Sequence, residues 1–293
     1  MMAKAENIKE RLKKTRKGLE NGLVYALLVT LGILWVLPIF YLIYTAFRVT
    51  PSTGIINTLF PNDLRLGLGN FSKLFTQTDF LRWLANTLLV ATCSCLLSTL
   101  FILMVSYALS RLRFKLRKPI MNALLVLGMF PGFMSMIAIY FILKAMGLTN
   151  SLLALILVYS GSAALSYYIC KGFFDTVPRA MEEAAILDGA SQVMIFLKIL
   201  LPMAKPIIVY TVLTSFISPW CDFIFVNTII SDRKLYTVSL GLYKMINAEK
   251  NSFNDNFTVY CAGAFVVGGI IVTLFMSMQR YYVEGVTAGA VKG

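Results

Sequence analysis

Long apolar runs separated by short charged segments dominate the pattern along this chain. A helix needs about 20 consecutive apolar residues to cross the hydrocarbon core of a bilayer. Runs of that length, almost free of charge, predict six membrane-spanning helices, with Asp222 interrupting the fifth. The expected spans lie near 22–47, 84–109, 119–143, 150–170, 206–231 and 256–279.

The distribution of lysine and arginine predicts how these spans are oriented. Six spans place both termini on one side of the membrane. If that side is the cytoplasm, the cytoplasmic segments carry 18 of the 27 basic residues and the outer segments carry 9. Short cytoplasmic segments are usually the richer in basic residues, so we expect a basic cytoplasmic N-terminus over 1–21, a transmembrane domain over 22–279 and a cytoplasmic tail over 280–293. The first apolar run is too long for a cleavable signal peptide and has no cleavage site after it.

The overall composition agrees with a membrane protein. Hydrophobic residues make up 58% of the chain and charged residues 14%, with a mean hydropathy of +0.75. A soluble domain is typically about half apolar and a quarter charged. The net charge of +13 could indicate nucleic-acid binding. The basic residues lie in short clusters between the apolar runs, however, so we expect contact with lipid and none with nucleic acid.

Several kinds of chemistry are excluded or disfavoured by the residue inventory. The chain has no histidine, which excludes histidine-dependent catalytic triads and metal sites. The five cysteines lie inside apolar runs, and we interpret them as small apolar residues rather than redox or metal groups. No Gly-Lys dipeptide occurs anywhere, so the chain cannot contain a P-loop for nucleotide. We therefore expect no catalytic residue, metal or cofactor on this chain.

The most informative segment is the expected cytoplasmic connection 171–205, which carries helix signals of its own. Pro178 favours a helix start, and Gly189 can end that helix in the left-handed conformation. Ser191 can cap a second helix, which should stop at Pro202. These signals predict a compact projection over 178–202, which we call the elbow.

Two positions for the elbow are open on these signals alone. It could be a re-entrant or amphipathic hairpin lying on the membrane surface. The acidic residues Glu182, Glu183 and Asp188 disfavour this position, because the cytoplasmic leaflet is itself anionic. An acidic, alanine-rich helix is better suited to a groove on a partner protein.

The residues of the elbow also resemble a known motif. The string EEAAILDGA at 182–190, followed by Phe196, Leu201-Pro202 and Pro206, is similar without gaps to the EAA loop of binding-protein-dependent ABC importers. In that family the loop forms a coupling helix that docks in a cleft of the cytoplasmic ATPase. The resemblance implies that the coupling contacts are Glu182, Glu183, Ala184, Ala185, Asp188, Gly189 and Ala190.

The resemblance covers nearly the whole chain. The runs YALSR at 107–111, MFP at 129–131, PWCDF at 219–223 and the tail 282–293 resemble the carbohydrate branch of the family, above all the second permease of maltodextrin importers. One departure is Cys221, where family members often carry asparagine. The resemblance implies an all-α integral membrane fold with six helices, and a coupling-helix elbow between the fourth and fifth.

The same resemblance implies a location and a set of partners. The chain would lie in the bacterial cytoplasmic membrane and form the translocation path together with a homologous permease subunit. Two cytoplasmic ATPase subunits would bind ATP and magnesium on its behalf. An extracellular or periplasmic sugar-binding protein would deliver the substrate. A malto-oligosaccharide is the expected substrate, with galacto-oligosaccharide as the alternative.

Asp222 is the first candidate for contact with a sugar. A charge near the middle of the bilayer costs about 3 kcal/mol, so this carboxylate should face protein, water or a partner. With Trp220, Phe223 and Phe225 it could form an aromatic sugar platform. Alternatively, it satisfies backbone donors freed by Pro219 or pairs with another subunit. The candidate substrate path comprises Phe130, Trp220, Asp222, Phe223 and Asn227.

The expected outer loop 232–255 supplies the remaining candidates. Tyr236, Tyr243 and Asn247 could contact the binding protein, or could belong to an ordinary solvated loop.

Two other classes of function have weaker support from the sequence. An ion-coupled secondary transporter should show inverted repeats and several embedded charges. A membrane enzyme acting on lipid-linked sugar should show clustered acids or metal ligands at the membrane face, whereas the acidic cluster of this chain lies on the elbow.

Overall fold

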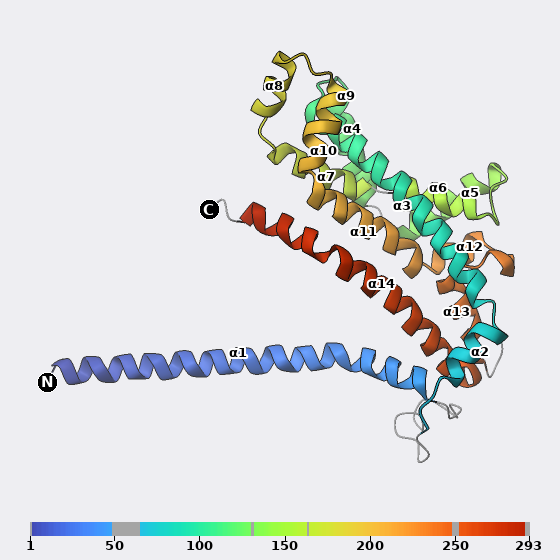
Figure 1. The fold of residues 1–293 in the computed structure, drawn as a ribbon, viewed down its shortest axis with the longest axis horizontal. Helices are drawn as coiled ribbons and strands as arrows, with labels where there is room; N and C mark the ends of the chain where they lie inside the picture. Colours follow the sequence, from blue (N-terminus) through green and yellow to red (C-terminus); the bar gives the residue numbers. More distant parts are fainter. Residues whose placement is uncertain (1, 49–64, 130–131, 163, 248–251, 291–293) are drawn as a thin grey trace.

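The computed structural model describes residues 2–48, 65–129, 132–162, 164–247 and 252–290. Across these residues the regular structure is helical, apart from one isolated antiparallel bridge between Arg48 and Leu66. Figure 1 shows most helices gathered in an elongated bundle, while the first helix, α1 (Met2–Phe47), extends away from it. The expected all-α membrane architecture is confirmed.

Membrane-spanning capacity comes from single helices and from bent pairs. Within the described residues, the apolar parts of α1, α3 (Phe80–Arg111) and α14 (Ser252–Ala290) are each long enough to cross a membrane. Three pairs of segments reach that length when taken together, and each is bent by more than 40°. These pairs are α4 (Arg117–Met129) with α5 (Gly132–Ala145), α6 (Leu152–Gly161) with α7 (Ala164–Thr176), and the stretch 192–203 with α11 (Lys205–Cys221).

The fifth expected span is broken where the sequence places its charge. Helix α11 ends at Cys221, and Asp222 follows with an extended backbone (φ −89°, ψ 107°). A short helix, α12 (Ile224–Ile229), continues beyond it. Pro219 lies in the last turn of α11, where its missing N–H removes a backbone hydrogen bond. The stretch 206–231, which the sequence predicts as one span, is thus divided at Asp222 into two helices.

At three places a helix continues beyond the expected membrane segment. Helix α1 runs unbroken from Met2, so no helix boundary separates 1–21 from the first span. Helix α7 continues to Thr176, beyond the expected end of the fourth span at residue 170. Helix α14 continues to Ala290, so the backbone of the expected tail is helical up to that residue. The change from apolar to polar sequence does not end these helices, and the glycines near the three boundaries, Gly22, Gly172 and Gly285, lie inside them.

One end of the bundle is covered by short helices. These are α2 (Gly69–Gln77), the 3₁₀ turn η3 (Arg233–Leu235) and α13 (Val238–Asn247). A buried cluster that includes Leu74, Phe80 and Trp83 joins them to the end of α1 and the start of α14. Gly241 of α13 packs directly against the Trp83 ring, and a Cβ at this position would lie 2.2 Å from Trp83 Cδ2.

This close approach predicts a large effect of one added methyl group. Gly241→Ala should destabilise the chain by about 1–3 kcal/mol, because the Trp83 ring is buried and cannot swing aside. The measurement is the Tm of the purified chain in detergent. Gly268→Ala is the matched control, since a Cβ there meets nothing within 4 Å. Equal Tm values for the two variants would contradict the packing argument.

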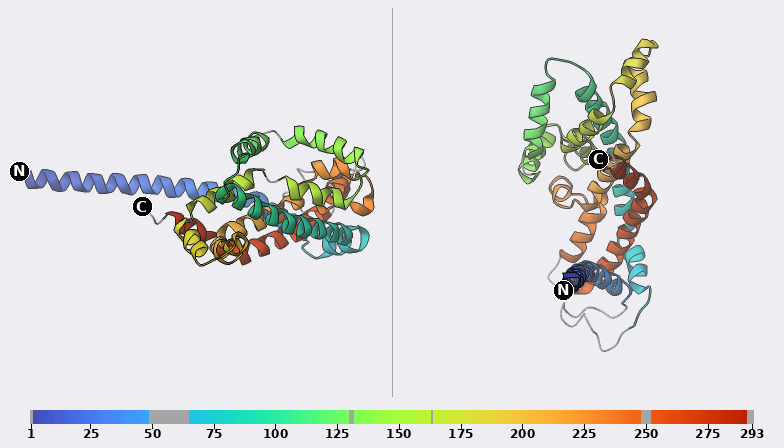
Figure 2. Two further views of the ribbon diagram at one scale, coloured as in Figure 1. Left: turned by 90° about the horizontal axis from the view of Figure 1, so that it is seen from above. Right: turned by 90° about the vertical axis from the view of Figure 1, so that its left-hand side faces the viewer.

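The opposite end of the bundle carries the elbow. It comprises α8 (Ala180–Leu187), α9 (Gln192–Ile195), a π-helical turn η2 (Phe196–Leu200) and α10 (Leu201–Met203). Figures 1 and 2 show α8 and α9 projecting beyond the bundle, far from α2 and α13. The fold therefore places the elbow at one end of the bundle and the short helices α2 and α13 at the other.

Candidate coupling elbow and membrane cavity

The first limb of the elbow ends in a glycine-dependent turn. Gly189 has a φ of +83°, which confirms the predicted left-handed conformation. The amide of Ala190 donates to the carbonyl of Ala185 (2.9 Å), and the amide of Gly189 donates to that of Ile186 (3.0 Å). These two bonds form a Schellman motif, which satisfies the last carbonyls of α8. The spacing from Ala185 to Ala190 in the EAA-like string is the spacing that this motif requires.

The second limb begins and ends close to the predicted residues. Ser191 Oγ accepts a hydrogen bond from the Met194 amide (3.3 Å), so the predicted cap is confirmed. The helical stretch continues through the π turn and passes Pro202 by one residue, to Met203. There the chain turns by 82° into α11. The second limb of the elbow is therefore joined directly to α11, and the two reach membrane-spanning length only when taken together.

The elbow has a packed side and an open side. Ala185 and Ala190 pack on a buried cluster that contains Phe174, Ile195 and Leu200. The open side carries large apolar residues: Leu187 (88% exposed), Val193, Leu197, Ile186, Met194 and Met181. Of the predicted coupling residues, Glu183, Ala184, Asp188 and Gly189 are exposed, whereas Glu182, Ala185 and Ala190 are half-buried. An apolar tip on a projecting segment fits a partner protein better than water.

Both limbs are tied to the end of α3. Tyr107 donates its hydroxyl to Gln192 Oε1 (2.8 Å), and its ring packs on Phe196 with 4.8 Å between centroids. Arg111 reaches Glu182 on the first limb, with Nε 2.9 Å from Oε1. The sequence singled out the run 107–111 only for its family resemblance. Nothing in the local pattern indicated that it holds the elbow.

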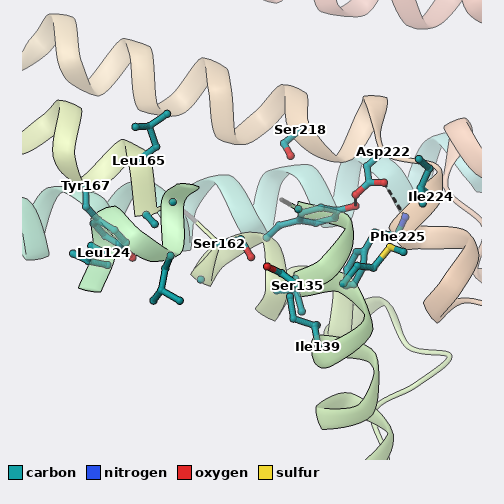
Figure 3. A pocket seen from close by; sticks show the side chains of 18 residues that line it. Leu124, Ser135, Ile139, Ser162, Leu165, Tyr167, Ser218, Asp222, Ile224 and Phe225 are labelled. Atoms are coloured by element: carbon teal, nitrogen blue, oxygen red, sulfur yellow. Dashed lines mark hydrogen bonds between the residues drawn. The ribbon is translucent and has the colours of Figure 1, made fainter. Parts of the chain in front are cut away.

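A second feature is a cavity of about 730 Å³ among the bent pairs and α11. Figure 3 shows Ser135, Ser162, Ser218 and Asp222 around it, contributed by α5, the α6–α7 junction and the end of α11. Most of the remaining lining is apolar or aromatic. A mainly apolar space with a few convergent hydroxyl and carboxylate groups is typical of a small-molecule site.

The carboxylate of Asp222 is held by two donors. Tyr159 donates its hydroxyl to Oδ2 (3.0 Å), and the Phe225 amide donates to Oδ1 (3.0 Å). Figure 3 shows Phe225 beside Asp222. The second bond satisfies an amide in the first turn of α12. Asp222 therefore serves the backbone after Pro219, as one of the two alternatives expected, and it also lines the cavity.

The structure separates the other expected substrate-path residues from Asp222. Trp220 and Phe223 line a different cavity of about 410 Å³, between α11, α13 and α14. Phe223 stacks on Tyr243, with ring centroids 4.6 Å apart. Asn227 is exposed on α12. Phe130 lies outside the described residues. The contiguous platform expected from the sequence is thus divided between two cavities, because the chain changes direction at Asp222.

The three residues expected to contact the binding protein also differ in their surroundings. Tyr236 is half-buried, and its carbonyl accepts a hydrogen bond from Asn86 Nδ2 (2.9 Å). Tyr243 is 37% exposed, and its ring stacks on Phe223. Asn247 is exposed and donates its side-chain amide to the carbonyl of Tyr243 (2.9 Å). Tyr243 and Asn247 thus lie on one accessible surface of α13.

Solved structures share this fold. One is a bacterial ABC transporter involved in the import of the acidic polysaccharide alginate, with a TM-score of 0.74 over 89% of this chain and 96% of that one, at 22% identity. The MetNI methionine ABC transporter, in an inward-facing conformation, gives a TM-score of 0.57 over 70% of this chain and 95% of that one, at 18% identity. At these identities the similarity establishes the fold.

Sequence comparison establishes the family. The chain is 30% identical to a galactooligosaccharide transport permease of Bacillus subtilis, over 96% of this chain and 98% of the relative. It is also 30% identical to a maltodextrin transport permease of Streptococcus pneumoniae, over the same shares of the two chains. Residues 98–286 match the model of the inner membrane component of binding-protein-dependent transport systems. The chain therefore belongs to this family of inner membrane transport components.

Proposed function

We propose that this chain is a permease subunit of an ATP-driven oligosaccharide importer and that it hydrolyses no ATP itself. It lines the path together with a homologous permease, while two ATPase subunits bind ATP and magnesium in the cytoplasm. A sugar-binding protein delivers substrate at the end covered by α2 and α13. Both termini lie in the cytoplasm, in keeping with the bias of basic residues.

The observation that carries the proposal is the two-sided elbow. Its packed side is bound to α3, and its open side presents Leu187 and neighbouring apolar residues. An ATP-driven transporter subunit without a P-loop needs to receive energy through contact with another protein, and such contacts favour a rigid, apolar, projecting surface. The coupling contacts would be the exposed residues Glu183, Ala184, Asp188 and Gly189, with Ala185 and Ala190 shaping the turn beneath them.

The test is reconstitution of the complete importer in proteoliposomes. We expect ATP hydrolysis to be stimulated by the loaded binding protein and labelled sugar to accumulate inside. Sugar uptake driven by an ion gradient, by the purified chain alone and without an ATPase, would overturn the proposal. The same assay identifies the substrate, because only the correct sugar should stimulate hydrolysis through the binding protein.

For the substrate we propose a malto-oligosaccharide. The maltodextrin permease of Streptococcus pneumoniae supports this choice through its similarity over nearly the whole of both chains. A galacto-oligosaccharide is the second candidate, because the Bacillus subtilis relative matches equally well. Comparison of maltotriose with a galactotriose in the reconstituted assay separates the two.

We further propose that the sugar passes the cavity at Asp222. Asp222→Asn should lower the maximal import rate by about tenfold, since hydrogen bonds to a charged group contribute about 1.5–3 kcal/mol. The variant keeps an acceptor for the Phe225 amide, so the amount of inserted protein should stay at the parental level. Asp79→Asn is the control: this acid forms an exposed ion pair with Arg233, and its loss should change import little. If Asp222→Asn imports sugar at the parental rate, Asp222 does not contact the sugar during transport.

A further inference from the structure

The last residue of α3, Arg111, carries a charge in an unusual place. Its side chain is only 3% exposed, although it lies at the end of a membrane-spanning helix. A buried charge is costly unless paired and hydrogen-bonded. The groups that compensate Arg111 therefore indicate what the position is built to do.

Three separate elements meet at this guanidinium. Nη2 donates to the carbonyl of Val177 (2.7 Å) and to the carbonyl of Phe174. These carbonyls lie at the C-terminal end of α7, where a positive charge is favourable, and the Phe174 carbonyl also accepts from the Val177 amide (3.2 Å). On the other side, Nε lies 2.9 Å from Oε1 of Glu182, in the first turn of α8. One side chain thus joins α3, the end of α7 and the elbow.

Neighbouring residues strengthen two of these connections. Ser110 donates to Asp175 Oδ1 (2.6 Å), which fixes α3 against α7, and Asp175 also pairs with Lys171. Tyr107 binds Gln192 on the second limb of the elbow. The Arg111–Glu182 contact is the ionic connection from this cluster to α8, and its two side chains are largely buried, at 3% and 12% exposure.

The two adjacent glutamates of the EAA-like string therefore have different surroundings. Glu182 is half-buried and pairs with Arg111, whereas Glu183 is exposed. We propose that Arg111 and Glu182 form a latch that holds the elbow to α3 and α7, so that a displacement of the elbow is transmitted to these spans, while Glu183 contacts the ATPase. The proposal rests on the function proposed above. In it Arg111 and Glu182 are positioning residues.

A first experiment tests the latch without relying on transport. Hydrogen–deuterium exchange of residues 180–192 is measured on the full chain in lipid nanodiscs. Glu182→Gln keeps the size of the side chain and removes its charge, and it should speed exchange in this segment by about tenfold, because Arg111 is left as an uncompensated buried charge. Arg111→Lys should also speed exchange in this segment. The guanidinium of arginine presents its donors in a rigid fork that reaches all three partners, and the compact ammonium of lysine does not. Glu183→Gln, one residue away, should leave exchange unchanged.

A second experiment tests transmission in the complete reconstituted importer. Glu182→Gln and Arg111→Lys should keep the ATPase bound but import several-fold less sugar per ATP hydrolysed. Glu183→Gln should weaken co-purification of the ATPase. Unchanged exchange in Glu182→Gln overturns the latch, and unchanged sugar per ATP overturns its role in transmission. Failure of the parental complex to couple ATP to uptake would instead refute the proposed function, and the exchange result would still decide whether the latch exists.

Discussion

Gly189→Val should leave the chain inserted in the membrane and reduce sugar import by more than about tenfold. Valine is strongly disfavoured at a φ of +83°, at a cost of about 1–2 kcal/mol or more. To relieve this strain the turn has to open, which breaks the bonds from Gly189 and Ala190 to the end of α8. A Cβ at this position meets nothing within 4 Å, so no clash inside the chain contributes. Uptake by proteoliposomes, with insertion checked by membrane fractionation, measures the effect.

Two variants separate backbone strain from other causes. Gly189→Asn should retain much more import, because asparagine tolerates this conformation, as Asn150 does in this same chain at a φ of +58°. Gly147→Val introduces comparable strain at the opposite end of the bundle, where φ is +69° and the space is also open. It should spare the coupling of ATP hydrolysis to import. Normal import and coupling in Gly189→Val would end the elbow hypothesis.

Leu187→Glu should abolish binding of the ATPase while leaving the isolated chain as stable as the parent. Leu187 is 88% exposed and contributes little to packing within the chain. In a docked elbow the same side chain would be buried, and an unpaired carboxylate in an apolar interface costs several kcal/mol. The measurement is co-purification of the ATPase with the tagged chain, together with the Tm of the chain alone.

The matched control is Met146→Glu, an equivalent change in an exposed apolar side chain (62%) that follows α5 at the other end of the bundle. Its ATPase should co-purify at the parental level. Leu187→Met, which preserves the apolar surface, should also bind normally. Retention of the ATPase by Leu187→Glu would place the docking surface elsewhere on the chain.

Local features of this protein could be predicted because neighbouring residues decide them. The apolar runs reflect the solvent that each helix meets, and they give the approximate positions of the spans. The left-handed turn at Gly189 and the cap at Ser191 depend on contacts within about five residues, so the sequence pattern was sufficient. The cost of a charge in an apolar run predicted that Asp222 faces protein or a polar space, and its carboxylate is bonded by Tyr159 and the Phe225 amide.

Other features depend on residues far apart along the chain. Asp222 and Tyr159 are 63 residues apart, and Tyr107 and Gln192 are 85 apart. The aromatic run around Asp222 looked contiguous, yet the break in the helix sends Trp220 and Phe223 to another cavity. No local period indicates which side of a bent helix a side chain will face, because that direction depends on what packs against it.

The sequence by itself determined that this is a helical membrane protein of the binding-protein-dependent transport family, with a glycine-stopped elbow and no P-loop. Only the tertiary structure decided that Arg111 pairs with the elbow and that Glu182 is half-buried while Glu183 is exposed. Hydropathy and caps act over one or two helical turns, whereas a buried ion pair exists only when folding brings distant charges together and excludes water from them.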